Sequence, residues 1–306
     1  MVPGCWRRGR TAVIAHGYAE VNGIRLHYAS AGAGRLILFA HGFPQFWYAW
    51  KDQFAEFGRD HFAVAPDLRG YNLSSKPPAV DDYRPKHLVE DLRALAAHLG
   101  HDRFTLVGHD WGGVVAWAFA IRHPDLLERL VIVNAPHPGI FARELRENPA
   151  QQRASAYILK LRAAGAEERL AEDGYRRLVN MALREGLERG YFTEADHAAF
   201  VEAWSQPGAL TGSLNYYRAM RLDPAADRPV PTAGEPPADQ SALVVRVPTL
   251  VIWGERDTAL LPGNLDGLDA FVPDLTIRRV PDGSHWVIHE HPALVNGYIR
   301  EFIAGK

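Results

Sequence analysis

The chain has 306 residues, of which 47% are hydrophobic and 23% charged, and its formal net charge is −2. This near-neutral charge, with its dispersed arginines, speaks against a nucleic-acid partner, and no apolar run is long enough to cross a membrane. The single cysteine, Cys5, excludes an internal disulfide framework. We therefore expect a cytoplasmic protein whose length suits one large α/β core and an insertion.

The N-terminal residues are predicted to lie outside that core. Residues 1–10 are basic, and the apolar stretch at 11–15 is too short for a signal peptide, so we expect an extension over 1–15. Next, residues 18–21 and 24–28 alternate apolar and polar around Asn22-Gly23. This pattern predicts a hairpin of two antiparallel strands at the start of a core that runs over 16–140.

A continuous apolar run at 35–40 predicts a buried strand, and an aromatic helix is expected over 46–57. Between them lies His41-Gly42-Phe43-Pro44. This loop is a candidate site for an oxyanion, with the backbone N–H of Phe43 as one donor; the alternative is a turn shaped only by its glycine and proline.

The next predicted strand, over 61–65, leads into a loop that contains Asp67 and Arg69. We expect these two side chains to pair with each other and fix the loop rather than touch a ligand. Apolar residues spaced three and four apart then predict a helix over 85–99.

Residues 104–117 contain the most informative pattern of the chain. A short buried strand meets Asp110, flanked by Gly108 and Gly112, and a small-residue helix follows. This is the strand–turn–helix pattern of a nucleophile elbow, which presents its central side chain above a sheet. A carboxylate there suits attack on an sp³ carbon, giving an alkyl ester. The alternative is an aspartate that only caps the helix.

Strands continue to alternate with helices through a sixth strand at 130–133. The pattern predicts an α/β fold: an eight-stranded, mostly parallel sheet with helices on both faces and ligands beyond the carboxyl ends of the strands. Residues 141–222 show only amphipathic helical stretches, which predict a helical lid inserted after the sixth strand. Its expected apolar positions are Leu161, Leu170, Leu178, Met181 and Leu183.

A Pro-, Ala- and Asp-rich linker is expected over 223–239, and the core resumes over 240–306. Its last strands are predicted at 247–253 and 275–280, and a closing helix at 292–303. Asp257 and His285 each follow one of these strands, as Asp110 follows an earlier one.

Asp110, Asp257 and His285 therefore follow the chain order nucleophile, acid, histidine, which is the order of the α/β-hydrolase triad. In this interpretation His285 takes a proton from water and Asp257 orients it. The backbone N–H groups of Phe43 and Trp111 hold the oxyanion that forms when water attacks the Asp110 ester. Each residue alone has an ordinary alternative as a packing or surface residue.

Together the motifs resemble those of the epoxide hydrolases with an α/β-hydrolase fold. They are His41-Gly-Phe-Pro44, Gly108-His-Asp-Trp-Gly-Gly113, Trp253-Gly-Glu-Arg-Asp257 and Gly283-Ser-His-Trp286, and the likeness runs from about residue 18 onward. The resemblance implies conversion of a small-molecule epoxide to a vicinal diol, with no cofactor, metal or membrane partner. The oligomeric state stays open, a homodimer being one option.

Within the lid, Asn215-Tyr-Tyr-Arg218 resembles the motif of one ring-opening tyrosine, which implies that role for Tyr217. The segment that begins at Tyr157 resembles the other, and Tyr216 is its alternative. Opening an epoxide at neutral pH needs a proton donor for the alkoxide, and a tyrosine with its ordinary pKa of about 10 can supply it.

Two other functions remain open. Dehalogenases of this fold also use an aspartate, but haloalkane dehalogenases usually carry an asparagine where Phe43 stands, and fluoroacetate dehalogenases carry arginines where Trp111 and Val114 stand. Asn134 cannot serve as a triad acid after the sixth strand, which leaves Asp257. A non-catalytic receptor of this fold would lack a complete triad or the lid tyrosines.

Overall fold

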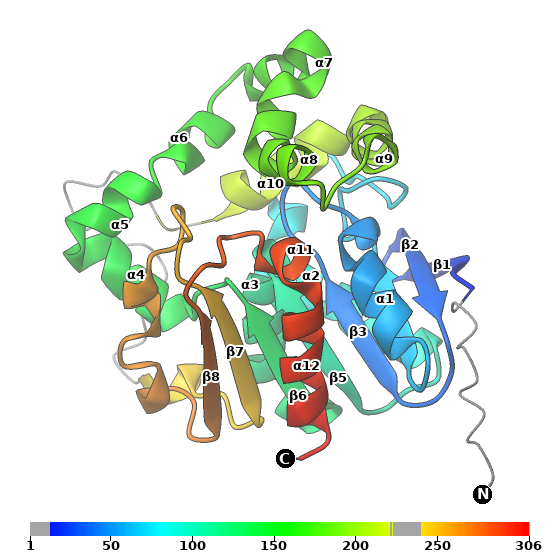
Figure 1. Ribbon diagram of the computed structural model, residues 1–306, viewed down its shortest axis with the longest axis vertical. Coiled ribbons are helices and arrows are strands. Elements are labelled where there is room, and N and C mark those ends of the chain that lie inside the picture. The colour runs from blue at the N-terminus through cyan, green and yellow to red at the C-terminus, as the bar shows by residue number, and fades with distance from the viewer. Residues whose placement is uncertain (1–12, 221, 223–239, 306) are drawn as a thin grey trace, which may run out of the picture.

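The computed structural model describes residues 13–220, 222 and 240–305, and its centre is an eight-stranded sheet of order β1-β2-β4-β3-β5-β6-β7-β8 (Figure 1). Strand β1 pairs antiparallel with β2 and β2 with β4, and all other neighbours are parallel. This confirms the predicted α/β fold. The strands are β1 Ala15–Val21, β2 Ile24–Ala31, β3 Leu36–Ala40, β4 Phe62–Pro66, β5 Phe104–His109, β6 Leu127–Val133, β7 Thr249–Gly254 and β8 Leu275–Val280.

Burial explains why the sequence pattern located the strands. Strands β3, β5 and β7 are buried along their whole length, as expected of parallel strands covered on both faces. The edge strand β1 instead alternates between exposed and buried residues at its end. Asn22 and Gly23 have positive φ angles of 48° and 75°, which the tight hairpin turn between β1 and β2 requires.

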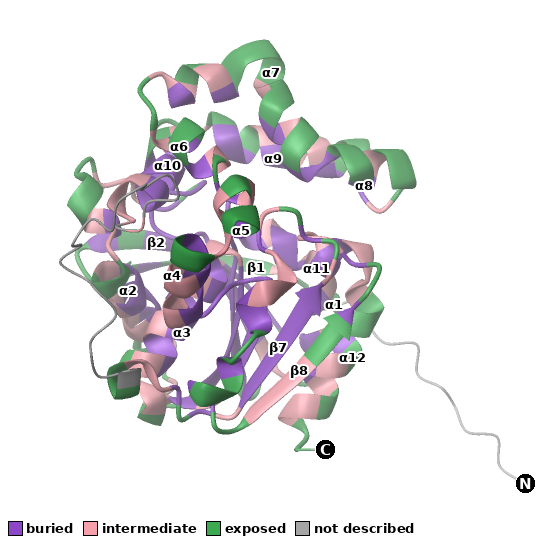
Figure 2. Cartoon of the chain, turned by 90° about the vertical axis from the view of Figure 1, so that its left-hand side faces the viewer, coloured by how far each residue is buried: buried purple, intermediate pink, exposed green. Residues whose placement is uncertain are grey.

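Helices cover both faces of the sheet, α1 and α12 lying in front of it in Figure 1 and α2 and α3 behind it. The buried residues of α2, among them Leu88, Leu92 and Leu95, lie three and four apart and face the core. Figure 2 shows how burial concentrates in the strands and in the helix faces packed on them. The core helices are α1 Lys51–Phe57, α2 Pro85–His98, α3 Trp111–Arg122, α11 Val287–Glu290 and α12 Pro292–Ile303.

Between β6 and β7 the described chain is helical and lies over the carboxyl ends of the strands (Figure 1). We call α4–α10 the helical insertion. Its helix α7 is interrupted at Glu172–Tyr175, where φ and ψ leave the helical region. The helices are α4 Pro138–Glu147, α5 Pro149–Ala154, α6 Tyr157–Arg162, α7 Ala166–Ala182, α8 Arg184–Arg189, α9 Glu194–Ser205 and α10 Ala209–Ala219.

Short 3₁₀ helices complete the secondary structure, and η1 precedes α1 within the region expected to be one helix. These segments are η1 Trp47–Trp50, η2 Val80–Tyr83, η3 Pro124–Leu126, η4 Gln240–Leu243, η5 Pro262–Leu265 and η6 Leu268–Ala270. Within the described residues, no helix combines the length and apolarity that crossing a membrane would need.

Two predictions about side chains were wrong. Asp67 and Arg69 do not pair: Arg69 donates two hydrogen bonds to Asp91 of α2, at 2.6 and 2.7 Å, and Asp67 accepts from His27 at 2.6 Å. Residues two apart in this loop point to different neighbours. Met181 is 40% exposed rather than buried, unlike the other four predicted apolar positions of the insertion. The predictions for residues 1–12, including Cys5, and for the linker over 223–239 lie outside the described residues.

Candidate active site

The turn between β5 and α3 holds Asp110 in a strained backbone conformation, with φ 51° and ψ −122°. Such a conformation costs about 1–3 kcal/mol in a residue other than glycine. Close packing stabilises it: a Cβ on Gly108 would collide with the backbone of Gly112, and a Cβ on Gly112 with the backbone at Ala40 and His41. The glycines therefore let the elbow approach β3 and lift the Asp110 carboxylate above the carboxyl end of the sheet.

The loop after β3 supplies hydrogen-bond donors to that carboxylate. The Phe43 N–H donates to Asp110 Oδ1 at 2.7 Å, and the Trp111 N–H is a second donor to the same side chain. Gly42 is necessary for this approach, because a Cβ there would collide with the carboxylate. The N–H groups of Phe43 and Trp111 thus both donate to the Asp110 carboxylate.

Asp257 and His285 follow β7 and β8 and meet above the same edge of the sheet. His285 Nδ1–H donates to Asp257 Oδ2 at 2.7 Å, and His285 Nε2 lies 3.7 Å from Asp110 Oδ2. Asp257 Oδ1 accepts from the N–H groups of Ala259 and Leu260 at 2.8 and 2.9 Å. The imidazole therefore stands between the two carboxylates, with Nε2 facing the elbow.

The electrostatics of these three groups are set by burial and by their mutual charges. Burial raises the pKa of Asp110, although His285 and the two N–H donors oppose it. For Asp257 burial also raises the pKa, but His285 and its hydrogen bonds outweigh this and lower it. Burial lowers the pKa of His285, yet Asp257 first and Asp110 next raise it to about 9. At neutral pH the resting site thus favours a protonated His285.

Tyr157 and Tyr217, on α6 and α10, lie next to each other over this site, their ring centroids 6.3 Å apart at 79°. The Tyr217 ring also contacts the rings of Phe43 and Trp111, at 5.4 and 5.1 Å. Burial raises the pKa of both hydroxyls, and the negative charge of Asp110 raises it further. Both tyrosines therefore carry their protons at neutral pH.

Tyr216 points elsewhere. Its hydroxyl is buried and donates to the backbone carbonyl of Arg69 at 2.9 Å. That proton is engaged in joining α10 to the loop after β4. Of the three tyrosines singled out in the sequence, Tyr157 and Tyr217 lie together over the site, and Tyr216 is used in packing.

Two neighbours of the triad were not predicted. Asn134, at the end of β6 with φ 40°, donates to Asp257 Oδ2 at 2.8 Å and accepts from Gly254 N at 2.9 Å. His109 donates from Nε2 to the His285 carbonyl at 2.8 Å, and burial keeps it neutral by holding its pKa well below the usual value. Their position beside a strand end was the available signal, but it did not reveal their partners.

The site thus brings together the Asp110 carboxylate, the His285 imidazole with its partner Asp257, two backbone N–H donors and two protonated tyrosine hydroxyls. In the described ranges 13–220, 222 and 240–305, no group of three or more His, Cys, Asp or Glu side chains is arranged to hold a metal ion. The groups present can perform nucleophilic attack, proton donation and base-assisted hydrolysis at one centre.

The chain is similar in sequence and structure to several known proteins. Residues 35–292 match the family described as alpha/beta hydrolase fold. A Bacillus subtilis (strain 168) AB hydrolase superfamily protein is 37% identical over 94% of this chain and 98% of its own length. Epoxide hydrolase 2 of Caenorhabditis elegans is 34% identical over 94% of this chain and 79% of its own. A Bacillus megaterium epoxide hydrolase, solved with an inhibitor, superposes with a TM-score of 0.88 at 38% identity, covering 94% of this chain and 100% of that one.

Proposed function

Because this chain belongs to the epoxide hydrolases of the α/β-hydrolase fold, we propose that it opens epoxides to vicinal diols through an alkyl ester on Asp110. The observation that carries the proposal is the opposition of Asp110 and the Tyr157–Tyr217 pair within one buried site. A nucleophile on one side and proton donors on the other suit an epoxide. When one of its carbon–oxygen bonds breaks, the oxygen stays on the neighbouring carbon as an alkoxide that needs a proton. The helical insertion acts as the lid over this site.

In the first half-reaction, Asp110 attacks a ring carbon and the carbon–oxygen bond on that carbon breaks. Oδ1 is held by the Phe43 N–H, which leaves Oδ2 as the attacking atom. The alkoxide takes a proton from Tyr157 or Tyr217. Because burial keeps both hydroxyls protonated, the donor is ready before the substrate arrives.

In the second half-reaction, water is deprotonated at His285 Nε2 and attacks the ester carbonyl. The developing negative charge lies on the oxygen held by Phe43 and Trp111. Collapse releases the diol oxygen, which takes the proton from His285. The new carboxyl group of Asp110 then loses its proton, and the tyrosinate takes up one proton. Both groups thereby return to their starting state.

The charge of Asp110 controls when His285 can act as a base. In the resting site the Asp110 carboxylate is one of the charges that raise the pKa of His285 to about 9. Alkylation converts this carboxylate to a neutral ester and removes that contribution. The pKa of His285 therefore falls when the ester forms, and the ring releases its proton to solvent, so that a neutral base is present when water is activated. His285 takes a proton back from solvent when the Asp110 carboxylate is restored.

A dehalogenase is the second candidate, since an aspartate nucleophile also displaces halide. A halide leaves without a proton, so the two buried tyrosine hydroxyls would have no chemical role, and Phe43 contributes only its backbone N–H. The pair of proton donors favours the epoxide.

The test is a single turnover of styrene oxide in ¹⁸O-labelled water. The first diol should carry oxygen from the enzyme, and the label should enter Asp110, as read by peptide mass spectrometry. Tyr157→Phe and Tyr217→Phe should each slow alkylation about 10²-fold. Product labelled directly from solvent would exclude the ester mechanism, and halide release from haloalkanes without diol formation would favour the dehalogenase.

A further inference from the structure

Tyr71 lies beside the active site and has no part in the mechanism above. It follows β4 in the loop that also contains Asp67, and its side chain is only 4% exposed. Its hydroxyl is buried and has no hydrogen-bond partner among the described residues. Leaving a buried hydroxyl unpaired costs free energy, so such a group in a folded protein needs an explanation.

Close backbone packing brings this loop against α10. A Cβ on either Gly70 or Gly212 would collide with the backbone of the other, so only glycine at both positions allows the contact. Tyr71 then stands edge-on to the rings of His41 and Tyr216, with centroids at 4.8 and 5.2 Å. These ring contacts fix the position of the Tyr71 side chain, and its hydroxyl remains available to hydrogen-bond a ligand.

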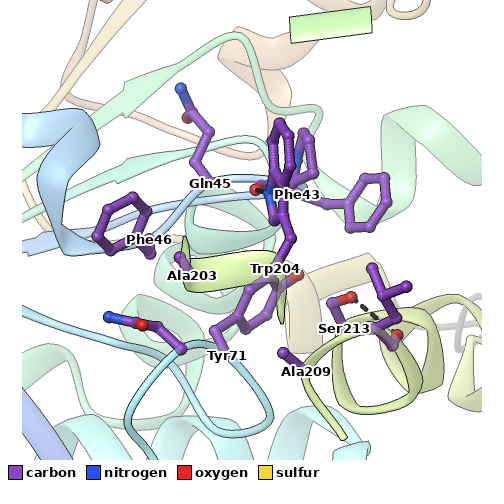
Figure 3. A pocket seen from close by; sticks show the side chains of 11 residues that line it. Phe43, Gln45, Phe46, Tyr71, Ala203, Trp204, Ala209 and Ser213 are labelled. Atoms are coloured by element: carbon purple, nitrogen blue, oxygen red, sulfur yellow. Dashed lines mark hydrogen bonds between the residues drawn. The ribbon is translucent and has the colours of Figure 1, made fainter. Parts of the chain in front are cut away.

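The side chain lines a small pocket between the loop after β3 and the helical insertion (Figure 3). The cavity is about 10 Å³ in volume, about enough for one water molecule or one hydroxyl group. Phe43, Tyr71, Trp204 and Ser213 are among its lining residues and are labelled in Figure 3, where Tyr71 and Trp204 lie close to each other. Phe43 links this pocket to the nucleophile, because it lines the pocket and its N–H donates to Asp110.

Two other polar side chains of the pocket have hydrogen-bond partners. The Trp204 indole donates to the Pro44 carbonyl at 2.6 Å, and the Ser213 hydroxyl donates to the Leu210 carbonyl at 2.9 Å. Gln45 Oε1 is also unpaired, but its amide nitrogen lies 2.6 Å from His289 Nε2. The Gln45 amide therefore keeps one partner, whereas the Tyr71 hydroxyl has none among the described residues.

The hydroxyl is also close enough to the nucleophile to feel its charge. Burial raises the pKa of Tyr71 most, and the neighbouring Tyr216 and the Asp110 carboxylate raise it further. It is therefore a neutral phenol that can donate a hydrogen bond. Because Phe43 both lines the pocket and donates to Asp110, we expect a substituent of the attacked ring carbon to extend toward this donor.

We propose that Tyr71 is a specificity-determining residue that binds one oxygen substituent of the substrate. The substrate class is an epoxide with a hydroxyl or ether oxygen on the carbon next to the ring, such as a 2,3-epoxy alcohol. The oxygen fills the pocket and accepts the Tyr71 proton. This inference rests on the proposed function, because it assumes that an epoxide reacts at Asp110.

The test compares glycidol with 1,2-epoxybutane, which has a methyl group in place of the hydroxyl. Tyr71→Phe should lower kcat/KM for glycidol about five- to tenfold, the value of one neutral hydrogen bond, and change that for 1,2-epoxybutane less than twofold. The melting temperature of Tyr71→Phe should stay level or rise, because the change removes an unpaired hydroxyl.

Tyr216→Phe is the matched control, since Tyr216 is a buried tyrosine in ring contact with Tyr71 whose hydroxyl does have a partner. It should lower the melting temperature and affect both substrates alike. A fall in melting temperature for Tyr71→Phe, or an equal effect on both substrates, would overturn the inference. Either result would mean that the hydroxyl stabilises the fold by hydrogen-bonding a buried water. If the wild-type protein opens neither epoxide, the proposed function itself fails, and this inference with it.

Discussion

At the scale of single residues, the proposed mechanism separates two tasks that act at different times. In this mechanism Asp110 and the tyrosines serve ring opening, whereas His285 and Asp257 serve hydrolysis of the ester. The separation follows from geometry, because His285 Nε2 faces Asp110 Oδ2 at 3.7 Å and Asp257 occupies the other ring nitrogen at 2.7 Å. Removing one group should therefore stop the cycle at a defined stage.

His285→Gln should leave alkylation intact and block hydrolysis, because only the second half-reaction needs a base. The alkyl-enzyme should accumulate and appear as a mass increase equal to that of the epoxide. Asp110→Asn is the control and should show no adduct. Sustained multiple turnover by His285→Gln would mean that another group activates the water.

Asp110→Asn should also lower the pKa of His285 below its value of about 9, since the change removes a neighbouring negative charge that raises it. The pH titration of the His285 ring signals by NMR measures this directly. Glu255→Gln, which changes a carboxylate paired with Arg279 at 2.8 Å, is a control for a general change in charge. An unchanged His285 pKa in Asp110→Asn would contradict the proposal that ester formation lowers the pKa of His285.

At the scale of elements, Arg162 connects the two helices that carry the tyrosines. It lies at the end of α6 and donates to the backbone carbonyls of Tyr217, Met220 and Leu222, at 2.8, 3.0 and 2.7 Å. These carbonyls lie at and beyond the end of α10, where a helix leaves its last carbonyls unpaired. One guanidinium thus fixes α6 relative to α10.

Arg162→Met should slow ring opening roughly tenfold, because small displacements of a proton donor are costly, and should leave hydrolysis of a preformed ester nearly unchanged. Stopped-flow alkylation and single-turnover ester decay measure the two rates. Arg189→Met, which removes an exposed arginine paired with Glu185 on α8, should change neither. Equal slowing of both rates would point to a general loss of structure.

The elements also show what the sequence could and could not predict. Strand ends are readable from short apolar runs, and parallel strands share one edge, so Asp110, Asp257 and His285 could be brought together without a structure. Side-chain partners depend on the third dimension. Arg69 therefore pairs with Asp91, twenty-two positions away, and Asn134, which the sequence analysis excluded as a triad acid, donates a hydrogen bond to Asp257.

At the scale of the whole molecule, the helical insertion is fastened to the core through Asp196 of α9. This carboxylate accepts from Lys51 and from the Tyr48 hydroxyl, both on the core side, and it caps its own helix with Thr193. Burial raises the pKa of Asp196, but the hydrogen bonds from Lys51, Thr193 and Tyr48 outweigh it and bring the pKa to about 2. The fastening is therefore pH-dependent.

A depressed pKa in the folded protein means that the ionised Asp196 stabilises the fold at pH values above its ordinary pKa of 3.8, and that this contribution disappears as the pH falls through about 2. Asp196→Asn should destabilise the protein by about 1–3 kcal/mol near neutral pH. The gap in melting temperature from wild type should narrow between pH 5 and pH 2. Asp173→Asn, at an exposed carboxylate on α7, should show no such gap, and a constant gap for Asp196→Asn would contradict the assignment.

The position of the helical insertion has a consequence for how the chain acquires activity during synthesis. Strands β6 and β7 are hydrogen-bonded neighbours, yet residues 134–248 separate them in the chain. Bringing the two ends of an unfolded segment of that length together has an entropic free-energy cost of about 4 kcal/mol. Asp110 is synthesised well before Asp257 and His285, which follow the last two strands, β7 and β8. Because the proposed mechanism needs all three residues, we expect turnover to begin only when these two strands have joined the sheet.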